Sequence, residues 1–136
     1  MTAGAQRAAG LAAVALVAAV IALALTHRDL GAPARKALPE AVGWTTGLAA
    51  PYGPSHGQRR TSCGRKFTSD LVGIAHPTLP CGAKLYISYR GRRVLTQVVD
   101  RGPKVPGRTF DITIGLARKL GLRGTQRVRW AWPRAS

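Results

Sequence analysis

The stretch VLTQVVDRGPKVPGRTFDIT, residues 94–113, says more about the fold of this 136-residue chain than any other part of the sequence. Its first residues are apolar and β-branched, as in a strand, and Gly102 and Pro103 form a turn signal directly after Asp100. The carboxylate of Asp100 is therefore expected at a strand end, where the backbone reverses and where binding and catalytic groups tend to lie. The alternative is that Asp100 only caps this turn or pairs with a neighbouring arginine.

Two further blocks of sequence lie upstream of this stretch. They are TSCG at residues 61–64 and AHPTLPCG at residues 75–82. With DRGP at residues 100–103 and GR followed by DIT within residues 107–113, they form four blocks in a fixed order, a much stronger signal than any one alone. In this order they resemble the double-psi β-barrel domain of the rare lipoprotein A family, bacterial cell-wall proteins related in fold to expansins and barwin. The resemblance covers residues 50–132.

The resemblance implies a mainly β fold, a small six-stranded double-psi β-barrel with one short helix. It also implies a groove for peptidoglycan glycan strands and, in active members, an endolytic lytic transglycosylase that leaves a 1,6-anhydro sugar without using water. One carboxyl group can protonate the leaving oxygen and then accept the proton of the C6 hydroxyl. The carry-over gives that role to Asp100, with His76 beside it as an orienting partner. Asp111, at the expected helix start, and Gly102 with Pro103 are expected to have structural duties.

The chain departs from the family pattern at residue 65. Active members commonly carry Thr-Ala-Ser-Gly-Glu, whereas residues 61–65 here read Thr-Ser-Cys-Gly-Arg. A cation replaces an acid, and Arg65 is expected to lower the pKa of a nearby Asp100, because an opposite charge favours the ionised form. An ionised aspartate is a poor general acid. Asp70 lies close in sequence as a possible substitute.

Two functions from different classes therefore remain. The first is a wall-cleaving transglycosylase that uses Asp100 and His76. The second is a non-catalytic, expansin-like wall-binding module in which these two residues hydrogen-bond sugar hydroxyls. The candidate binding residues are Tyr52, Arg65, Arg101 and Arg108. We expect no metal site and no cofactor, since two cysteines and one histidine at these spacings do not match the usual zinc pattern.

Short strands are expected at residues 71–75, 83–89 and 93–99, with the last two joined in a hairpin. In the final expected strand, residues 126–132, apolar residues alternate with arginines. This pattern predicts that Val128, Trp130 and Trp132 lie on the side that faces the core. Sugar stacking is the alternative use of the two tryptophans.

The only convincing helix follows residue 113. Thr113 is the expected N-cap and Gly121 the expected C-terminal stop. Between them Leu116, Ala117 and Leu120 form a narrow apolar stripe.

The N-terminal part contains an uninterrupted run of apolar or small residues from 8 to 25. Its 18 residues are long for a signal-peptide core and short for a membrane span, so cleaved signal and uncleaved anchor both remain open. We divide the chain into a signal peptide or N-terminal membrane anchor at 1–29, a linker at 30–42 and the barrel domain at 43–136. The expected location is outside the bacterial cytoplasmic membrane, secreted or anchored at its outer face, in the cell wall.

Cys63 and Cys81 are the only cysteines. In an exported chain such a pair predicts a disulfide, closing a loop of about 18 residues and contributing roughly 3 kcal/mol. Two free buried thiols are the alternative.

The charge is extreme, with 21 basic and 5 acidic residues, a formal +16. Without residues 1–39 the rest still carries +13. Such a surface attracts anionic partners. For an exported protein these are peptidoglycan strands and anionic wall polymers, with the membrane as a further partner if the N-terminal segment is not cleaved; we expect no nucleic acid. A basic protein that binds nucleic acid or anionic lipid is a third reading, which rests on charge alone.

Overall fold

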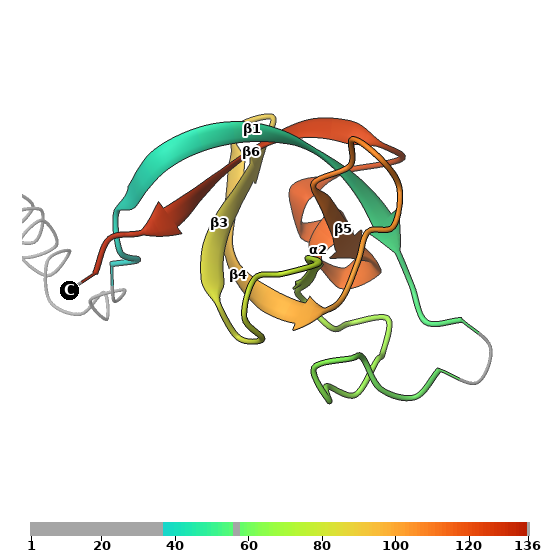
Figure 1. The fold of residues 1–136 in the computed structure, drawn as a ribbon. Helices are drawn as coiled ribbons and strands as arrows, with labels where there is room; N and C mark the ends of the chain where they lie inside the picture. Colours follow the sequence, from blue (N-terminus) through green and yellow to red (C-terminus); the bar gives the residue numbers. More distant parts are fainter. Residues whose placement is uncertain (1–36, 56–57, 136) are drawn as a thin grey trace, which may run out of the picture. The chain divides into compact units, whose positions relative to one another are not determined.

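The computed structural model describes residues 37–55 and 58–135. Within these ranges the strands close into a barrel in the order β1-β5-β2-β4-β3-β6 (Figure 1). The elements are β1 (Ala41–Tyr52), β2 (Ile74–Ala75), β3 (Lys84–Tyr89), β4 (Arg92–Asp100), β5 (Phe110–Thr113), α2 (Ile114–Leu120) and β6 (Gln126–Pro133). The predicted mainly β architecture, six strands with one short helix, is therefore confirmed for the described part of the chain.

The barrel combines parallel and antiparallel pairs. β1 runs parallel to β5 and β2 runs parallel to β4, while β3 pairs antiparallel with both β4 and β6. β6 returns antiparallel along β1, and the two strands lie side by side in Figure 1. This order places β2 between β4 and β5, and β6 between β1 and β3, so that β2 and β6 stand opposite each other in the ring.

The hairpin and the helix follow the sequence prediction closely. Tyr89 pairs with Arg92, so the connection from β3 to β4 is the two-residue turn Arg90-Gly91, both with positive φ (47° and 79°). Such a turn matches the twist of the strands and suits glycine at its second position. The Thr113 side chain caps α2 by accepting a hydrogen bond from Leu116 N, and Gly121 ends it with φ 68°.

Other strand predictions need correction. Only Ile74–Ala75 of the predicted strand 71–75 is extended and paired, and β1 was not predicted as a strand. Trp132 is 37% exposed and not part of the core, whereas Ala131 is fully buried. Trp132 lies one residue beyond Ala131, the last residue of β6 that pairs with β3, so β3 no longer covers it.

The barrel core is apolar and continuous with the helix. It contains residues from every strand and from α2, including Ala49, Ile74, Ile87, Val98 and Leu116. The predicted export or anchor segment at residues 8–25 lies outside the described residues. Among those that are described, no helix is both long and apolar enough to cross a membrane.

Candidate functional site

The two carboxylates of interest stand on either side of one small residue. In the barrel register Ala75 of β2 pairs with Asp100 of β4 on one side and with Asp111 of β5 on the other. Strand spacing of about 4.8 Å puts the two aspartate Cα atoms about 10 Å apart. The pairing of β2 with β4 shifts register between Ile74 and Ala75, the point at which Asp100 is reached. Asp111 also pairs with Ala50 of β1, so small residues flank it on both sides.

Asp111 therefore lies in strand β5, and its predicted position at the helix start is wrong. The helix begins three residues later, after the Thr113 cap. Asp100, in contrast, is the last residue of β4, as predicted. The turn predicted at Gly102 and Pro103 is not found there: residues 101–104 are irregular, and the hydrogen-bonded turn comes later, where Arg108 N donates to the Val105 carbonyl (3.2 Å). Gly102 has φ 119°, which favours glycine, and its peptide bond to Pro103 is cis.

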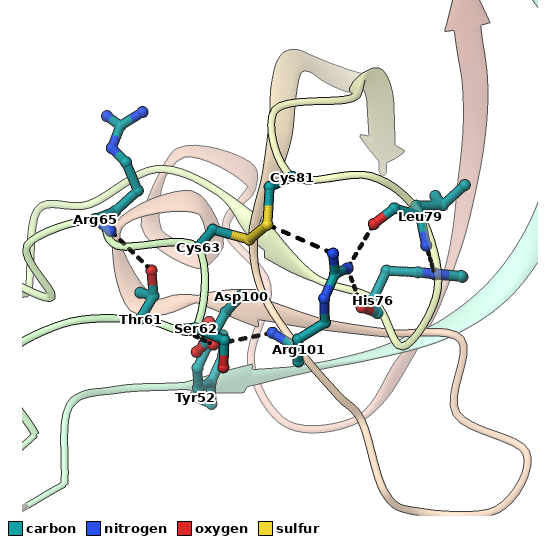
Figure 2. Close-up of a disulfide and its surroundings, with 10 residues drawn as sticks. All are labelled: Tyr52, Thr61, Ser62, Cys63, Arg65, His76, Leu79, Cys81, Asp100 and Arg101. Carbon is teal, nitrogen blue, oxygen red and sulfur yellow. Dashed lines mark hydrogen bonds between the residues drawn. A yellow bond between two sulfur atoms is a disulfide. The ribbon is translucent and has the colours of Figure 1, made fainter.

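Three hydrogen bonds hold the Asp100 carboxylate, which is only 5% exposed. Oδ1 accepts from the backbone N–H groups of Ser62 (2.8 Å) and Arg101 (2.9 Å), and Oδ2 accepts from the Tyr52 hydroxyl (3.0 Å) (Figure 2). Burial alone would raise the pKa of Asp100, but these hydrogen bonds outweigh it and hold the pKa below its ordinary value. Asp100 is therefore an ionised carboxylate.

Arg65 is not the cause of that lowered pKa, contrary to the sequence-based expectation. Its side chain is exposed and points away from Asp100 in Figure 2. Its backbone N–H donates instead to the Thr61 hydroxyl (3.1 Å), and this bond closes the 61–65 turn. The turn aims the Ser62 N–H at Asp100, so backbone geometry does what a side-chain charge was expected to do.

Tyr52, predicted as a binding aromatic, is a donor to Asp100. Burial, the negative charge of Asp100 and the hydrogen bond to it all raise the pKa of Tyr52, so the hydroxyl keeps its proton. Its ring packs against Phe67 with centroids 5.2 Å apart. This contact fixes the position from which the hydroxyl donates.

Asp111 is in a different electrostatic state. Burial raises its pKa, the charge of Asp100 raises it further, and the Arg108 guanidinium, with Nε 3.3 Å from Oδ1, only partly opposes the shift. No hydrogen bond within the described residues reaches this Oδ1. Arg108, predicted to contact ligand, is thus the ion partner of Asp111. Asp111 keeps a proton to higher pH than an ordinary aspartate.

His76 does not interact with the Asp100 carboxylate as predicted. Its Nδ1 accepts hydrogen bonds from the backbone N–H groups of Thr78 (3.2 Å) and Leu79 (3.0 Å), and its ring lies against Phe110. In Figure 2 the ring points toward Leu79 and away from Asp100. Burial and the charge of Arg101 lower the pKa of His76. It is a neutral histidine with its proton on Nε2, and it orders the turn after β2.

The predicted disulfide between Cys63 and Cys81 is present, with Cα atoms 5.7 Å apart (Figure 2). It ties the turn that carries Ser62 to the loop that follows His76. The Arg101 guanidinium, predicted to contact ligand, donates to the carbonyls of His76 and Leu79 and lies 3.5 Å from the Cys81 sulfur. Arg101 and the disulfide together fix the two loops over Asp100.

The remaining candidates lie elsewhere or were missed. Asp70 is an exposed partner of Arg118 on α2 (2.8 Å) and does not join Asp100. The role of the Ser62 N–H was not predicted, because a backbone donor is present whatever the residue type and so cannot be recognised from the sequence. Among residues 37–55 and 58–135, no group of three or more histidine, cysteine, aspartate or glutamate side chains is placed to hold a metal ion.

The sequence of the barrel matches a known family model. The model described as lytic transglycolase matches residues 45–130. Similar proteins include the probable endolytic peptidoglycan transglycosylase RlpA of Synechocystis, 36% identical over 81 residues, which are 58% of this chain and 25% of that protein. The endolytic peptidoglycan transglycosylase RlpA of Campylobacter jejuni is 36% identical over 94 residues, 65% of this chain and 34% of its own. The chain thus spans about a quarter to a third of the length of these relatives.

Solved structures support the fold. A Streptomyces papain inhibitor superposes with a TM-score of 0.56 at 22% identity, covering 71% of this chain and 99% of its own. An expansin from Clavibacter michiganensis superposes with a TM-score of 0.55 at 20% identity, covering 69% of this chain and 52% of its own. At these identities the likeness concerns the barrel fold alone.

Proposed function

The chain belongs to the lytic transglycolase family, and from that premise we propose that its barrel domain cleaves peptidoglycan glycan strands between N-acetylmuramic acid and N-acetylglucosamine, leaving 1,6-anhydro ends. One observation carries the proposal. Two carboxyl groups flank Ala75, and their surroundings shift their pKa values in opposite directions. Such a pair divides the duties of proton transfer and charge stabilisation between two groups of the same type.

We assign the proton transfers to Asp111 instead of Asp100. A general acid must carry its proton at the working pH, and the raised pKa of Asp111 favours that form. Protonated Asp111 gives its proton to the glycosidic oxygen as the C1–O bond breaks. The carboxylate left behind then accepts the proton of the C6 hydroxyl as that oxygen bonds to C1. Asp111 thus ends the reaction with the proton it started with, and no water is consumed.

Asp100 is the charged member of the pair. The glycosidic carbon gains positive charge in the transition state. A carboxylate that is already ionised and held in place by Ser62, Arg101 and Tyr52 stabilises this charge without reorganising. Its hydrogen bonds suit that duty and not the acid role expected from the family motif.

The architecture explains how the pair can work without the family glutamate at position 65. Asp111 comes from β5, far from the 61–65 turn in sequence, and is brought to Asp100 by strand pairing through Ala75. Ala50 of β1 and Ala75 of β2, the strand partners of Asp111 on its two sides, are both buried, so the position of Asp111 is fixed by the barrel itself. The second carboxyl group therefore does not depend on the turn that carries Arg65.

A second candidate is the non-catalytic, expansin-like wall-binding module. The observation in its favour is the same set of three hydrogen bonds to Asp100. A carboxylate held in this way can also serve a purely structural role beside a glycan-binding groove. In either case we propose that the protein acts outside the cytoplasmic membrane, where its polymer is found. The apolar run at residues 8–25 supports export of the chain.

The test is muropeptide mass spectrometry after incubating the purified full chain with intact and with peptide-stripped sacculi. We expect anhydro-muropeptides from the parent and from Asp70→Asn, a control that removes an exposed carboxylate away from the site. Asp111→Asn should lower release by at least about 100-fold, the typical contribution of a positioned acid or base. If the parent releases nothing but pellets with sacculi, the wall-binding module is the correct function. Release that survives Asp111→Asn would refute the assignment of the acid.

A further inference from the structure

A second candidate site lies on the side of the barrel opposite the carboxylates. A hollow of about 500 Å³ is formed by β1, β6 and the β3–β4 hairpin, and three arginines, Arg90, Arg127 and Arg129, line it. β6 stands opposite β2 in the ring of strands, and β2 carries Ala75 between the two aspartates. The hollow is therefore separate from the proposed catalytic site.

The strand geometry sets the spacing of these charges. Arg127 and Arg129 are both exposed on β6, with the buried Val128 between them. Two residues along a strand span about 6.8 Å on one face. Arg129 pairs with Thr46 of β1 on one side and with Ser88 of β3 on the other, and both also line the hollow. A guanidinium flanked by two hydroxyl groups is a set of hydrogen-bond donors suited to an oxyanion.

Two of the arginines are ordered by aromatic rings. The guanidinium of Arg129 lies 5.0 Å from the ring centroid of Trp44, and that of Arg90 lies 5.4 Å from the ring centroid of Tyr89. Stacking of this kind holds a long side chain in place before any ligand arrives. Less conformational entropy is then lost when an anion binds.

Carboxylates do not neutralise this surface. Glu40 pairs with Arg134, Asp70 with Arg118 and Asp111 with Arg108. Asp100, the remaining acid of the described residues, is engaged by Ser62, Arg101 and Tyr52. Within the described part of the chain the three arginines of the hollow therefore have no acidic partner.

We propose that this hollow binds a linear polymer of phosphodiester-linked units. The guanidinium fork matches the paired oxygens of a phosphate, and successive arginines along a strand match an anion that repeats along a chain. Single peptide carboxylates lack that repeat. A single-stranded nucleic acid would gain from free aromatic faces on which to stack its bases, but Trp44 and Tyr89 already hold guanidinium groups. The occupant is a phosphate polymer bound through its backbone.

Titration of the full chain with a synthetic glycerol phosphate oligomer, followed by calorimetry, tests this directly. We expect Arg127→Gln with Arg129→Gln to weaken binding by at least about tenfold, because each loses charge-assisted hydrogen bonds. The matched control is Lys119→Gln with Arg123→Gln, which removes the same charge outside the hollow and should bind like the parent. Arg127→Lys with Arg129→Lys keeps the charge and loses the fork, and it should also bind more weakly than the parent.

Three comparison probes identify the polymer. Polyglutamate of matched charge, single-stranded DNA and vesicles with anionic lipid should each bind more weakly than the phosphate oligomer, or without dependence on Arg127 and Arg129. The proposal is overturned if the control pair loses as much affinity as the arginine pair, since net charge alone would then explain binding. It is equally overturned if the lysine pair binds like the parent, or if any comparison probe binds as tightly with the same arginine dependence.

Discussion

Replacing Asp100 by asparagine should destabilise the barrel in a way that depends on pH. The carboxylate accepts three hydrogen bonds, two of them from the backbone N–H groups of Ser62 and Arg101 through Oδ1. Asparagine can keep these two as neutral bonds, at a loss of about 1 kcal/mol each, but cannot offer Tyr52 an acceptor at its amide nitrogen, a loss of about 1.5 kcal/mol. The expected destabilisation is about 3 to 4 kcal/mol at pH 7.

The sign of the pH dependence follows from the lowered pKa of Asp100 in the folded state. A group whose folded pKa lies below its unfolded value contributes stability above the unfolded pKa, and this contribution is lost as pH falls through the folded pKa. The parent should therefore exceed Asp100→Asn most at pH 7. The difference should shrink steadily below about pH 4, near the unfolded pKa of aspartate.

Urea unfolding of the oxidised chain at a series of pH values measures this difference. Asp70→Asn is the control, because Asp70 is an exposed partner of Arg118 and its loss should change the free energy of unfolding by less than about 1 kcal/mol. A parent-to-variant difference that stays constant from pH 7 to pH 3 would show that Asp100 is not held ionised by its hydrogen bonds. The division of roles between the two carboxylates would then lose its basis.

Three further outcomes are expected. Release of anhydro-muropeptides should fall as pH rises through the raised pKa of Asp111 and again at the acidic pH where Asp100 becomes protonated; a rate that is flat from pH 4 to pH 8 would exclude the pair. Cys63→Ser with Cys81→Ser should lower the free energy of unfolding by about 3 kcal/mol in urea titration, and a change below about 1 kcal/mol would contradict the loop-closure argument. Gly115→Ala should lower the melting temperature although alanine favours helices, because its Cβ would lie 2.6 Å from a backbone carbonyl oxygen; an unchanged or higher value would show that the helix can shift at little cost.

Local signals in the sequence predicted the local structure well. The β3–β4 hairpin, the Thr113 cap, the Gly121 stop and the Cys63–Cys81 bond each depend on a few neighbouring residues or on one pair. Strand β1 was missed because its exposed end is irregular, with a register shift between Val42 and Thr45. Trp132 was misassigned because it lies beyond Ala131, where the pairing of β6 with β3 ends, and an alternation of period two predicts burial only where both neighbouring strands are present.

The electrostatic states of the site could not be read from residue types. The positive charge of Arg65 led to the prediction that the pKa of Asp100 is lowered. The direction is correct, but the cause is the hydrogen bonds to the carboxylate and not Arg65. The actual donors include two backbone N–H groups, which every residue except proline carries, so no substitution pattern reveals them. Their aim depends on the 61–65 turn and on the disulfide that anchors it.

The loss of the family glutamate has a different meaning once strand pairing is known. The glutamate expected from the family pattern lies in the 61–65 loop, and with Arg65 at that position this loop has no carboxylate. Register places Asp111 independently, because Ala75 pairs with Asp100 and Asp111 at once. Burial and the charge of Asp100 raise the pKa of Asp111 against the opposing charge of Arg108, and this direction is the one that the proposed acid role requires. In the proposed mechanism the chain therefore needs no carboxylate in the 61–65 loop, provided that β2 continues to hold β4 and β5 in this register.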